Sequence, residues 1–106
     1  MDEKIRQKIE NDIKGSKVFL YMKGTPEAPL CGFSAQAVSI LKSYSVPFKS
    51  FNIFDDEAIR QGVKEYSDWP TFPQLYVNGE LVGGCDIMTE LHQNGELAKI
   101  LANVQS

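Results

Sequence analysis

The sequence predicts a single α/β domain spanning residues 1–106, with a four-stranded mixed sheet and helices on both faces. Apolar residues recur in the order helix, strand, helix, strand, helix, strand, strand, helix, helix. The first two strands flank a helix, which favours a parallel pair joined by a right-handed crossover. The last two strands flank Asn78-Gly79, a dipeptide typical of a two-residue antiparallel hairpin turn. Parallel and antiparallel pairs in one domain define the mixed sheet.

The first helix and the first strand follow directly from apolar spacing. Ile5, Ile9 and Ile13 stand four residues apart, which predicts an amphipathic helix over residues 2–14. The continuous apolar run over residues 18–22 is rich in strand formers, and we expect it to be a buried central strand.

The next part of the chain is predicted as a loop, a helix and a second strand. Residues 24–30 hold two prolines and a glycine, so they are expected to form a loop. Apolar residues at helical spacing predict a helix over 33–44, and Pro47 prevents its continuation. Residues 48–54 alternate well enough for the second strand.

The second half begins with a helix that Asp55 and Asp56 can cap, because carboxylates stabilise a helix N-terminus. Its inner face is expected to hold Ile59, Val63 and Tyr66. Residues 69–73 contain two prolines and are excluded from regular structure.

The hairpin and the C-terminal helices complete the domain. The hairpin strands are predicted over 74–77 and 80–82, and Gly83-Gly84 ends the second strand. Asp86 is expected to cap a final helical region, which Asn94-Gly95 divides in two.

Composition excludes several classes of function. Apolar residues make up 42% of the chain and charged residues 24%, which favours a folded domain over a disordered one. The net charge of −3 argues against nucleic acid as a partner, since phosphate binding needs clustered positive charge. The longest apolar run has five residues, far short of the ~20 that span a membrane. No secretory signal follows Met1, so we expect a cytoplasmic protein, or one of the mitochondrial matrix if a presequence was removed.

The chain has two cysteines, Cys31 and Cys85, too few for a disulfide-stapled secreted domain. In a reducing compartment they are reactive thiols, metal ligands or inert core residues, and composition leaves these three open. Local context favours a reactive Cys31, because it opens a predicted helix after a loop rich in glycine and proline. Helix N-terminal amides and the nearby Lys23 are expected to lower its pKa. Cys85 is interpreted as a small buried residue.

Three motifs resemble those of one family. Lys23-Gly24-Thr25-Pro26 with Cys31-Gly32-Phe33-Ser34 resembles the active-site loop of the monothiol glutaredoxins. The stretch from Trp69 to Gly79 and the segment Gly83-Gly84-Cys85-Asp86 resemble their second and third signatures. The resemblance covers nearly the whole chain and implies a thioredoxin fold, in agreement with the predicted order of elements.

The resemblance also implies a chemistry. A second cysteine would resolve a mixed disulfide at Cys31, but position 34 is a serine, so an external thiol must act or the thiolate must bind metal. A [2Fe-2S] cluster takes four thiolates. In this family two chains and two glutathione molecules supply them, which implies a homodimer bridged by the cluster.

Glutathione contacts can be carried over residue by residue from the family. Lys23 and Arg60 would bind the glycyl carboxylate end, Phe72 would pair its backbone with the cysteinyl part, and Pro73 would be cis. Cys85 and Asp86 would hold the γ-glutamyl end, while Thr71 and Lys64 are further candidates. Several of these contacts have a structural alternative: Arg60 and Lys64 can form a solvated helix face, and Asp86 can be a helix cap. Trp69, Pro70 and His92 are interpreted as packing or surface residues. A disulfide between the two cysteines is a lesser hypothesis.

Three functions are expected in order. The first is a carrier that passes a [2Fe-2S] cluster to apo iron–sulfur proteins, at most a weak enzyme. The second is a glutathione-dependent oxidoreductase that removes glutathione from protein thiols through Cys31. The third is an interaction module that shares its cluster with a BolA-like protein, as the family commonly does.

Overall fold

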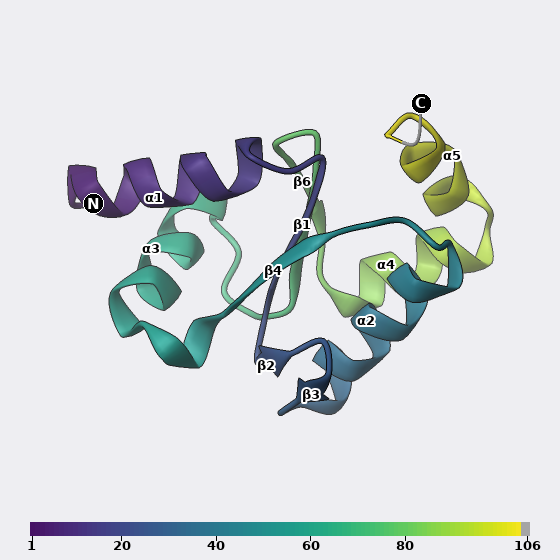
Figure 1. The fold of residues 1–106 in the computed structure, drawn as a ribbon, viewed down its shortest axis with the longest axis horizontal. Coiled ribbons are helices and arrows are strands. Elements are labelled where there is room, and N and C mark those ends of the chain that lie inside the picture. Colours follow the sequence, from purple (N-terminus) through teal and green to yellow (C-terminus); the bar gives the residue numbers. More distant parts are fainter. Residues whose placement is uncertain (105–106) are drawn as a thin grey trace.

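The computed structural model describes residues 1–104, and in it a four-stranded sheet separates two groups of helices (Figure 1). The strands are β1 (Val18–Met22), β4 (Lys49–Asn52), β5 (Gln74–Val77) and β6 (Glu80–Gly83), in the order β4-β1-β5-β6. β1 pairs in parallel with β4 and antiparallel with β5, and β5 pairs antiparallel with β6. The predicted mixed sheet is therefore confirmed, with β1 and β5 as its central strands.

The helices are distributed over both faces of the sheet. Helices α1 (Glu3–Lys14) and α3 (Glu57–Ser67) lie on one side in Figure 1, and α2 (Gly32–Ser43), α4 (Cys85–Gln93) and α5 (Glu96–Ala102) lie on the other. Each group covers its own apolar cluster, because side chains alternate across β1: Leu20 faces the α2 side and Tyr21 the α1 side. None of the helices within the described residues is long and apolar enough to cross a membrane.

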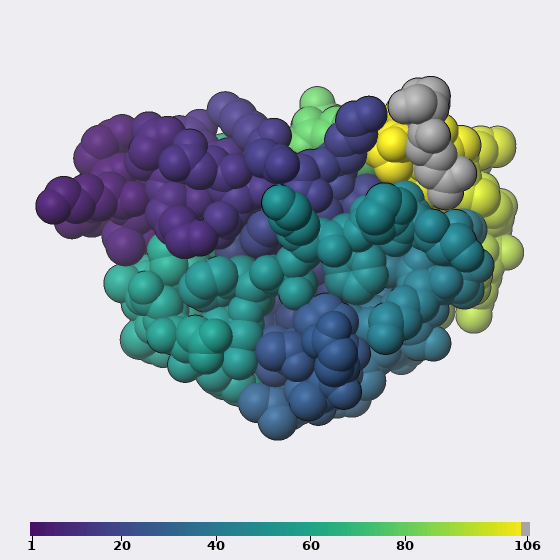
Figure 2. Space-filling view, viewed as in Figure 1, coloured from purple at the N-terminus to yellow at the C-terminus, as the bar shows by residue number. Residues whose placement is uncertain are grey.

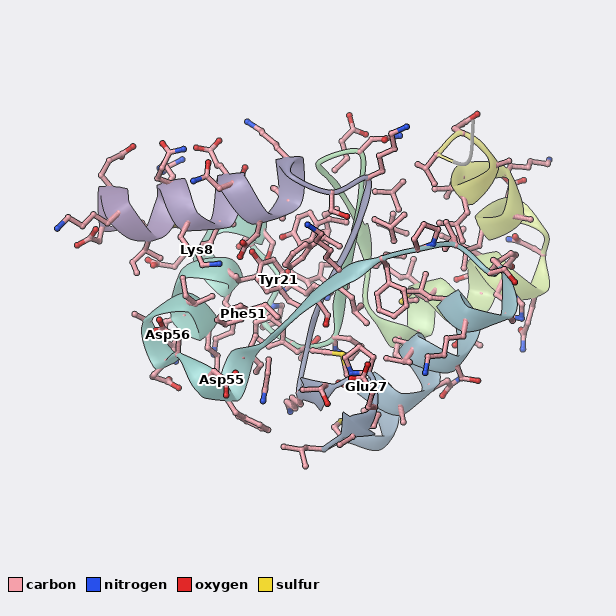
Figure 3. The ribbon with its side chains drawn as sticks, viewed as in Figure 1. Lys8, Tyr21, Glu27, Phe51, Asp55 and Asp56 are labelled. Atoms are coloured by element: carbon pink, nitrogen blue, oxygen red, sulfur yellow. The ribbon has the colours of Figure 1, made fainter. Side chains whose placement is uncertain are left out.

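Helix α1 is attached to the sheet by a network at its inner face. The Tyr21 hydroxyl donates a hydrogen bond to Asp12 at 3.1 Å, and the Lys8 ammonium lies 2.7 Å from the same carboxylate. Lys8 also lies 4.9 Å from the centre of the Phe51 ring (Figure 3). Burial and the Asp12 carboxylate together raise the pKa of Tyr21, which stays a neutral donor.

Two predicted segments differ from the structure in a way that bears on the site. The expected loop over 24–30 contains a short hairpin of β2 (Gly24–Thr25) and β3 (Ala28–Pro29), which projects at the lower edge of the face seen in Figure 2. Gly24 has a φ of +88°, and the Thr25 hydroxyl accepts a hydrogen bond from the Ala28 amide, so the turn closes within four residues. The strand expected over 48–54 ends at Asn52, where the 3₁₀ helix η1 (Ile53–Asp55) begins.

The helix starts also differ in part from the prediction. Asp56 caps α3, accepting hydrogen bonds from the amides of Ala58 and Ile59, as expected. Asp86 does not cap α4, because that helix begins one residue before it and Gly84 occupies the cap position. Its carboxylate is therefore on the first turn, exposed, and free for a role other than capping.

Candidate functional site

Cys31 occupies the N-cap position of α2, with extended backbone angles (φ −154°, ψ 139°). The loop ends there, and the thiol faces the unpaired amides of the first helical turn. The backbone amides of Ser34 and Phe33 lower the pKa of the Cys31 thiol, the Ser34 amide having the larger effect. Burial opposes this change and is the second-largest effect, while the Lys23 ammonium and the Ser34 hydroxyl lower the pKa by smaller amounts. The thiol is half-buried, unbridged and accessible.

Ser34 lies on the inner side of α2, fully buried, where a second active-site cysteine would otherwise stand. Its hydroxyl accepts a hydrogen bond from the Lys23 amide at 3.1 Å, which joins the end of β1 to the first turn of α2. The Ser34 side chain thus holds the backbone of Lys23 in place. It has no thiol with which to resolve a disulfide at Cys31.

A cleft of ≈ 370 Å³ opens near the start of α2, where Lys23 and Phe33 line it, although Cys31 itself is not among the lining residues. Most of the residues expected at the site from the sequence line it: Lys23, Arg60, Thr71, Phe72, Cys85 and Asp86. Phe33 and Trp69 line it as well, although the sequence favoured only a packing role for Trp69. Lys64 is not among the lining residues, although it stands on the same helix as Arg60, one turn further on.

Arg60 and Trp69 bring buried donors to this cleft. The Arg60 side chain is 31% exposed, and its Nη1 atom lies 3.1 Å from Glu57, but its Nε atom is buried without a hydrogen-bond partner among the described residues. The same holds for the indole Nε1 of Trp69. Two buried donors without an acceptor are unusual, because such a donor costs free energy.

The wall that follows β6 is made by the start of α4. Gly84 fits closely there: a Cβ at this position would lie 3.2 Å from the Pro73 carbonyl oxygen and 3.4 Å from the indole nitrogen of Trp69. The first amides of α4, those of Cys85, Asp86 and Ile87, have no acceptor within the helix and stand at the positive end of its dipole. This part of the cleft is suited to a carboxylate.

Cys85 contrasts with Cys31 in its surroundings. It is 7% exposed, and burial raises the pKa of its thiol, with Asp86 and Cys31 adding to the effect and the Thr89 hydroxyl opposing it. The Cys85 carbonyl accepts a hydrogen bond from that hydroxyl at 2.8 Å. Of the two sulfurs at the site, that of Cys31 is therefore the more readily ionised and the more nucleophilic.

The segment between α3 and β5 forms the remaining wall. Phe72 is buried and the Phe72–Pro73 peptide bond is cis, as the family resemblance implied. The buried Gln74 donates hydrogen bonds to the carbonyl oxygens of Trp69 and Thr71 at 3.0 and 3.1 Å, and it accepts one from the Tyr76 hydroxyl. Sequence reasoning missed this role, because Gln74 stands in a strand pattern where a polar residue is ordinarily exposed.

The comparisons with known proteins agree with this geometry. The glutaredoxin family model matches residues 18–82. A probable monothiol glutaredoxin 2 of Rickettsia felis is 60% identical over 93 residues, which are 88% of this chain and 89% of that protein. A monothiol glutaredoxin of Synechocystis described as ycf64-like is 50% identical over 101 residues, with coverage of 95% and 94%. The solution structure of reduced poplar apo GrxS14 superposes with a TM-score of 0.84 at 49% identity, covering 94% of this chain and 92% of that one.

The fold and the site define a thiol protein of the thioredoxin fold, with its accessible cysteine at the start of a helix. The chain belongs to the glutaredoxin family and is a monothiol glutaredoxin.

Proposed function

We propose that this protein binds a [2Fe-2S] cluster through Cys31 and passes it to apo iron–sulfur proteins, with glutathione as co-ligand. The observation that carries the proposal is an accessible thiol of lowered pKa that stands beside a cleft and has a buried serine in place of a resolving thiol. A ligating cysteine must be a thiolate, and Cys31 reaches that state at lower pH than an ordinary thiol.

The donor set of one chain fits a shared cluster. Cys85 is buried, and no group of three or more histidine, cysteine or acidic side chains among the described residues could hold a metal ion. One chain therefore offers one thiolate to a cluster that takes four. Two copies of Cys31 and two glutathione thiolates complete the set, so the cluster is expected to bridge a homodimer.

The cleft fits glutathione, a tripeptide with two carboxylates, an amino group and a thiol. Lys23 and Arg60 offer positive charge to the glycyl carboxylate. The backbone of Phe72 suits the cysteinyl part of glutathione, and the first amides of α4 suit the carboxylate of its γ-glutamyl part. The amino group next to that carboxylate can donate a hydrogen bond to Asp86. Thr71 lies on the same wall as a further contact, whereas Lys64 is outside the lining and is not proposed.

Anaerobic reconstitution with iron, sulfide and glutathione tests the proposal. The wild-type protein is expected to give a coloured dimer, measured by visible absorption and by size-exclusion chromatography. Cys31→Ser should remain colourless and monomeric, while Cys85→Ser should keep the colour, because the Cys85 sulfur is buried and protonated. A colourless wild-type monomer under these conditions would contradict the proposal.

A second function is favoured by the same thiolate. Cys31 can attack the glutathione sulfur of a protein–glutathione disulfide, which releases the protein thiolate and leaves glutathione bonded to Cys31. A free glutathione thiolate then attacks that sulfur, forms oxidised glutathione and regenerates the Cys31 thiolate. Turnover of a glutathionylated peptide by cluster-free protein measures this activity. Fast turnover together with failed reconstitution would rank the oxidoreductase first.

A BolA-like protein is a further proposed partner, which would replace one copy of this chain at the cluster. This proposal is supported by the single thiolate that each chain offers, because the remaining cluster ligands must then come from other molecules. Pull-down with such a protein, with and without cluster, tests it: capture only of the cluster-loaded form is expected, and capture of neither form would contradict it.

A further inference from the structure

The peptide group between Lys23 and Gly24 is held at both ends. Its carbonyl oxygen accepts a hydrogen bond from the Leu30 amide at 2.9 Å, which closes the β2–β3 hairpin onto the end of β1. Its N–H, on Gly24, donates to the side-chain oxygen Oδ1 of Asn52, also at 2.9 Å. The first bond is local, but the second joins residues 28 positions apart. Gly24 is buried, so its N–H depends on the protein for an acceptor.

Asn52 is brought to this peptide by the register of the parallel strands. In the β1–β4 pair Met22 stands opposite Asn52. The last residue of β4 therefore lies beside the end of β1, next to Lys23. The same Oδ1 atom accepts a second hydrogen bond from the Phe54 amide at 3.0 Å and caps η1. One side chain thus fixes both the turn that follows β4 and the loop that carries Lys23.

We propose that Asn52 is a positioning residue for the site: by holding the Gly24 amide it keeps the Lys23 side chain at the cleft beside Cys31. Asn52 itself is not among the residues that line the cleft, so it acts through Lys23 and touches no ligand there. The inference rests on the proposed role of the Cys31 thiolate, and it holds whether that thiolate binds a cluster or attacks a disulfide.

Loss of the Asn52 side chain would release one end of this peptide group. The Gly24 N–H would be left buried without an acceptor, a state that the chain avoids by moving. The backbone is closely packed at this point, because a Cβ on Gly24 would lie only 2.6 Å from the Ala28 oxygen and the Leu30 nitrogen. With the bond to Asn52 gone, the Lys23 backbone keeps the bonds from its N–H to Ser34 and from the Leu30 amide to its carbonyl, but it loses its tie to β4. We expect the Lys23 side chain to be held less closely to its position near Cys31. The thiolate would then lose part of the stabilising effect of the Lys23 charge.

The pH dependence of Cys31 alkylation by iodoacetamide, followed by mass spectrometry, measures this loss without cluster or glutathione. Failure of reconstitution would therefore leave the test intact. Asn52→Ala should shift the profile to higher pH and slow alkylation at pH 7 by about two- to fivefold, the range for one partly exposed charge pair. Asn52→Ser should do the same, because serine can still cap η1 but is too short to serve Gly24 as well.

A double-mutant cycle separates positioning from general damage. In a Lys23→Ala background, Asn52→Ala should produce no further shift, since the charge it positions is already gone. Asn94→Ala is the matched control. The Asn94 side chain also accepts a hydrogen bond from a backbone N–H two residues later, that of Glu96, but it stands between α4 and α5 and has no hydrogen bond to Lys23 among the described residues. The proposal is overturned by an unchanged profile in both Asn52 variants, by a shift that persists without Lys23, or by an equal shift in Asn94→Ala.

Discussion

The buried Ser34 hydroxyl accepts the Lys23 amide at 3.1 Å, so the residue that replaces a resolving thiol also holds the backbone of a cation at the site. Ser34→Ala would remove this acceptor and leave the Lys23 N–H unpaired, at a cost of about 1–3 kcal/mol in the free energy of unfolding. It should also raise the pKa of Cys31, because the Ser34 hydroxyl is one of the groups that lower it. Urea denaturation measures the first effect and the pH profile of alkylation the second. An unchanged alkylation profile would show that the hydroxyl is structural only.

Arg60 and Lys64 provide a matched pair of cations on α3, one turn apart, of which only Arg60 lines the cleft. Arg60→Ala should weaken glutathione binding about tenfold or more, the usual loss for a hydrogen bond to a charged group. Lys64→Ala should leave binding within about twofold, since a solvated charge outside the site acts weakly. Titration of glutathione into Cys31→Ser protein, followed by nuclear magnetic resonance shifts, measures both. Equal losses would mean that the two cations act only through net charge.

The sequence predicted the sheet and the position of Cys31 from local patterns, whereas the other residues expected around Cys31 came from the family resemblance. The apolar run of β1, the Asn78-Gly79 turn and the cysteine that opens α2 each fall within a few residues. The contacts of Asn52 with Gly24 and of Gln74 with Trp69 could not be predicted, because strand register and loop closure bring those residues together. Lys64 and Arg60 look alike in sequence, and only the direction that each helix position faces separates them.

Substitution of Gly84 tests how tightly the α4 wall of the cleft is packed, and Gly32, which does not line the cleft, serves as the control. A side chain at Gly84 would press on the Pro73 carbonyl and the Trp69 indole, whereas a Cβ at Gly32 meets nothing within 4 Å. Gly84→Ala should therefore cost about 1–3 kcal/mol of stability through overpacking and weaken glutathione binding, because the start of α4 must shift. Gly32→Ala, in the first turn of α2, should be neutral or slightly stabilising. Thermal unfolding and the same glutathione titration compare the two, and a Gly84→Ala protein that behaves like Gly32→Ala would show that this wall yields freely.

The buried Cys85 thiol makes the free energy of unfolding depend on pH in the alkaline range. Because burial raises the pKa of its thiol above the ordinary value of 9.0, the thiol stays protonated in the folded protein where the unfolded chain would ionise. This contribution is fully present below the pKa of the unfolded chain and is lost as pH rises through the higher folded pKa. Cys85→Ala lacks the group, so its free energy of unfolding should fall less steeply with pH above about 9. Urea denaturation of both proteins from about pH 8 to 11 isolates the effect, because the buried tyrosines titrate alike in each. Parallel curves over that range would show that the Cys85 thiol ionises as freely in the folded protein as in the unfolded chain.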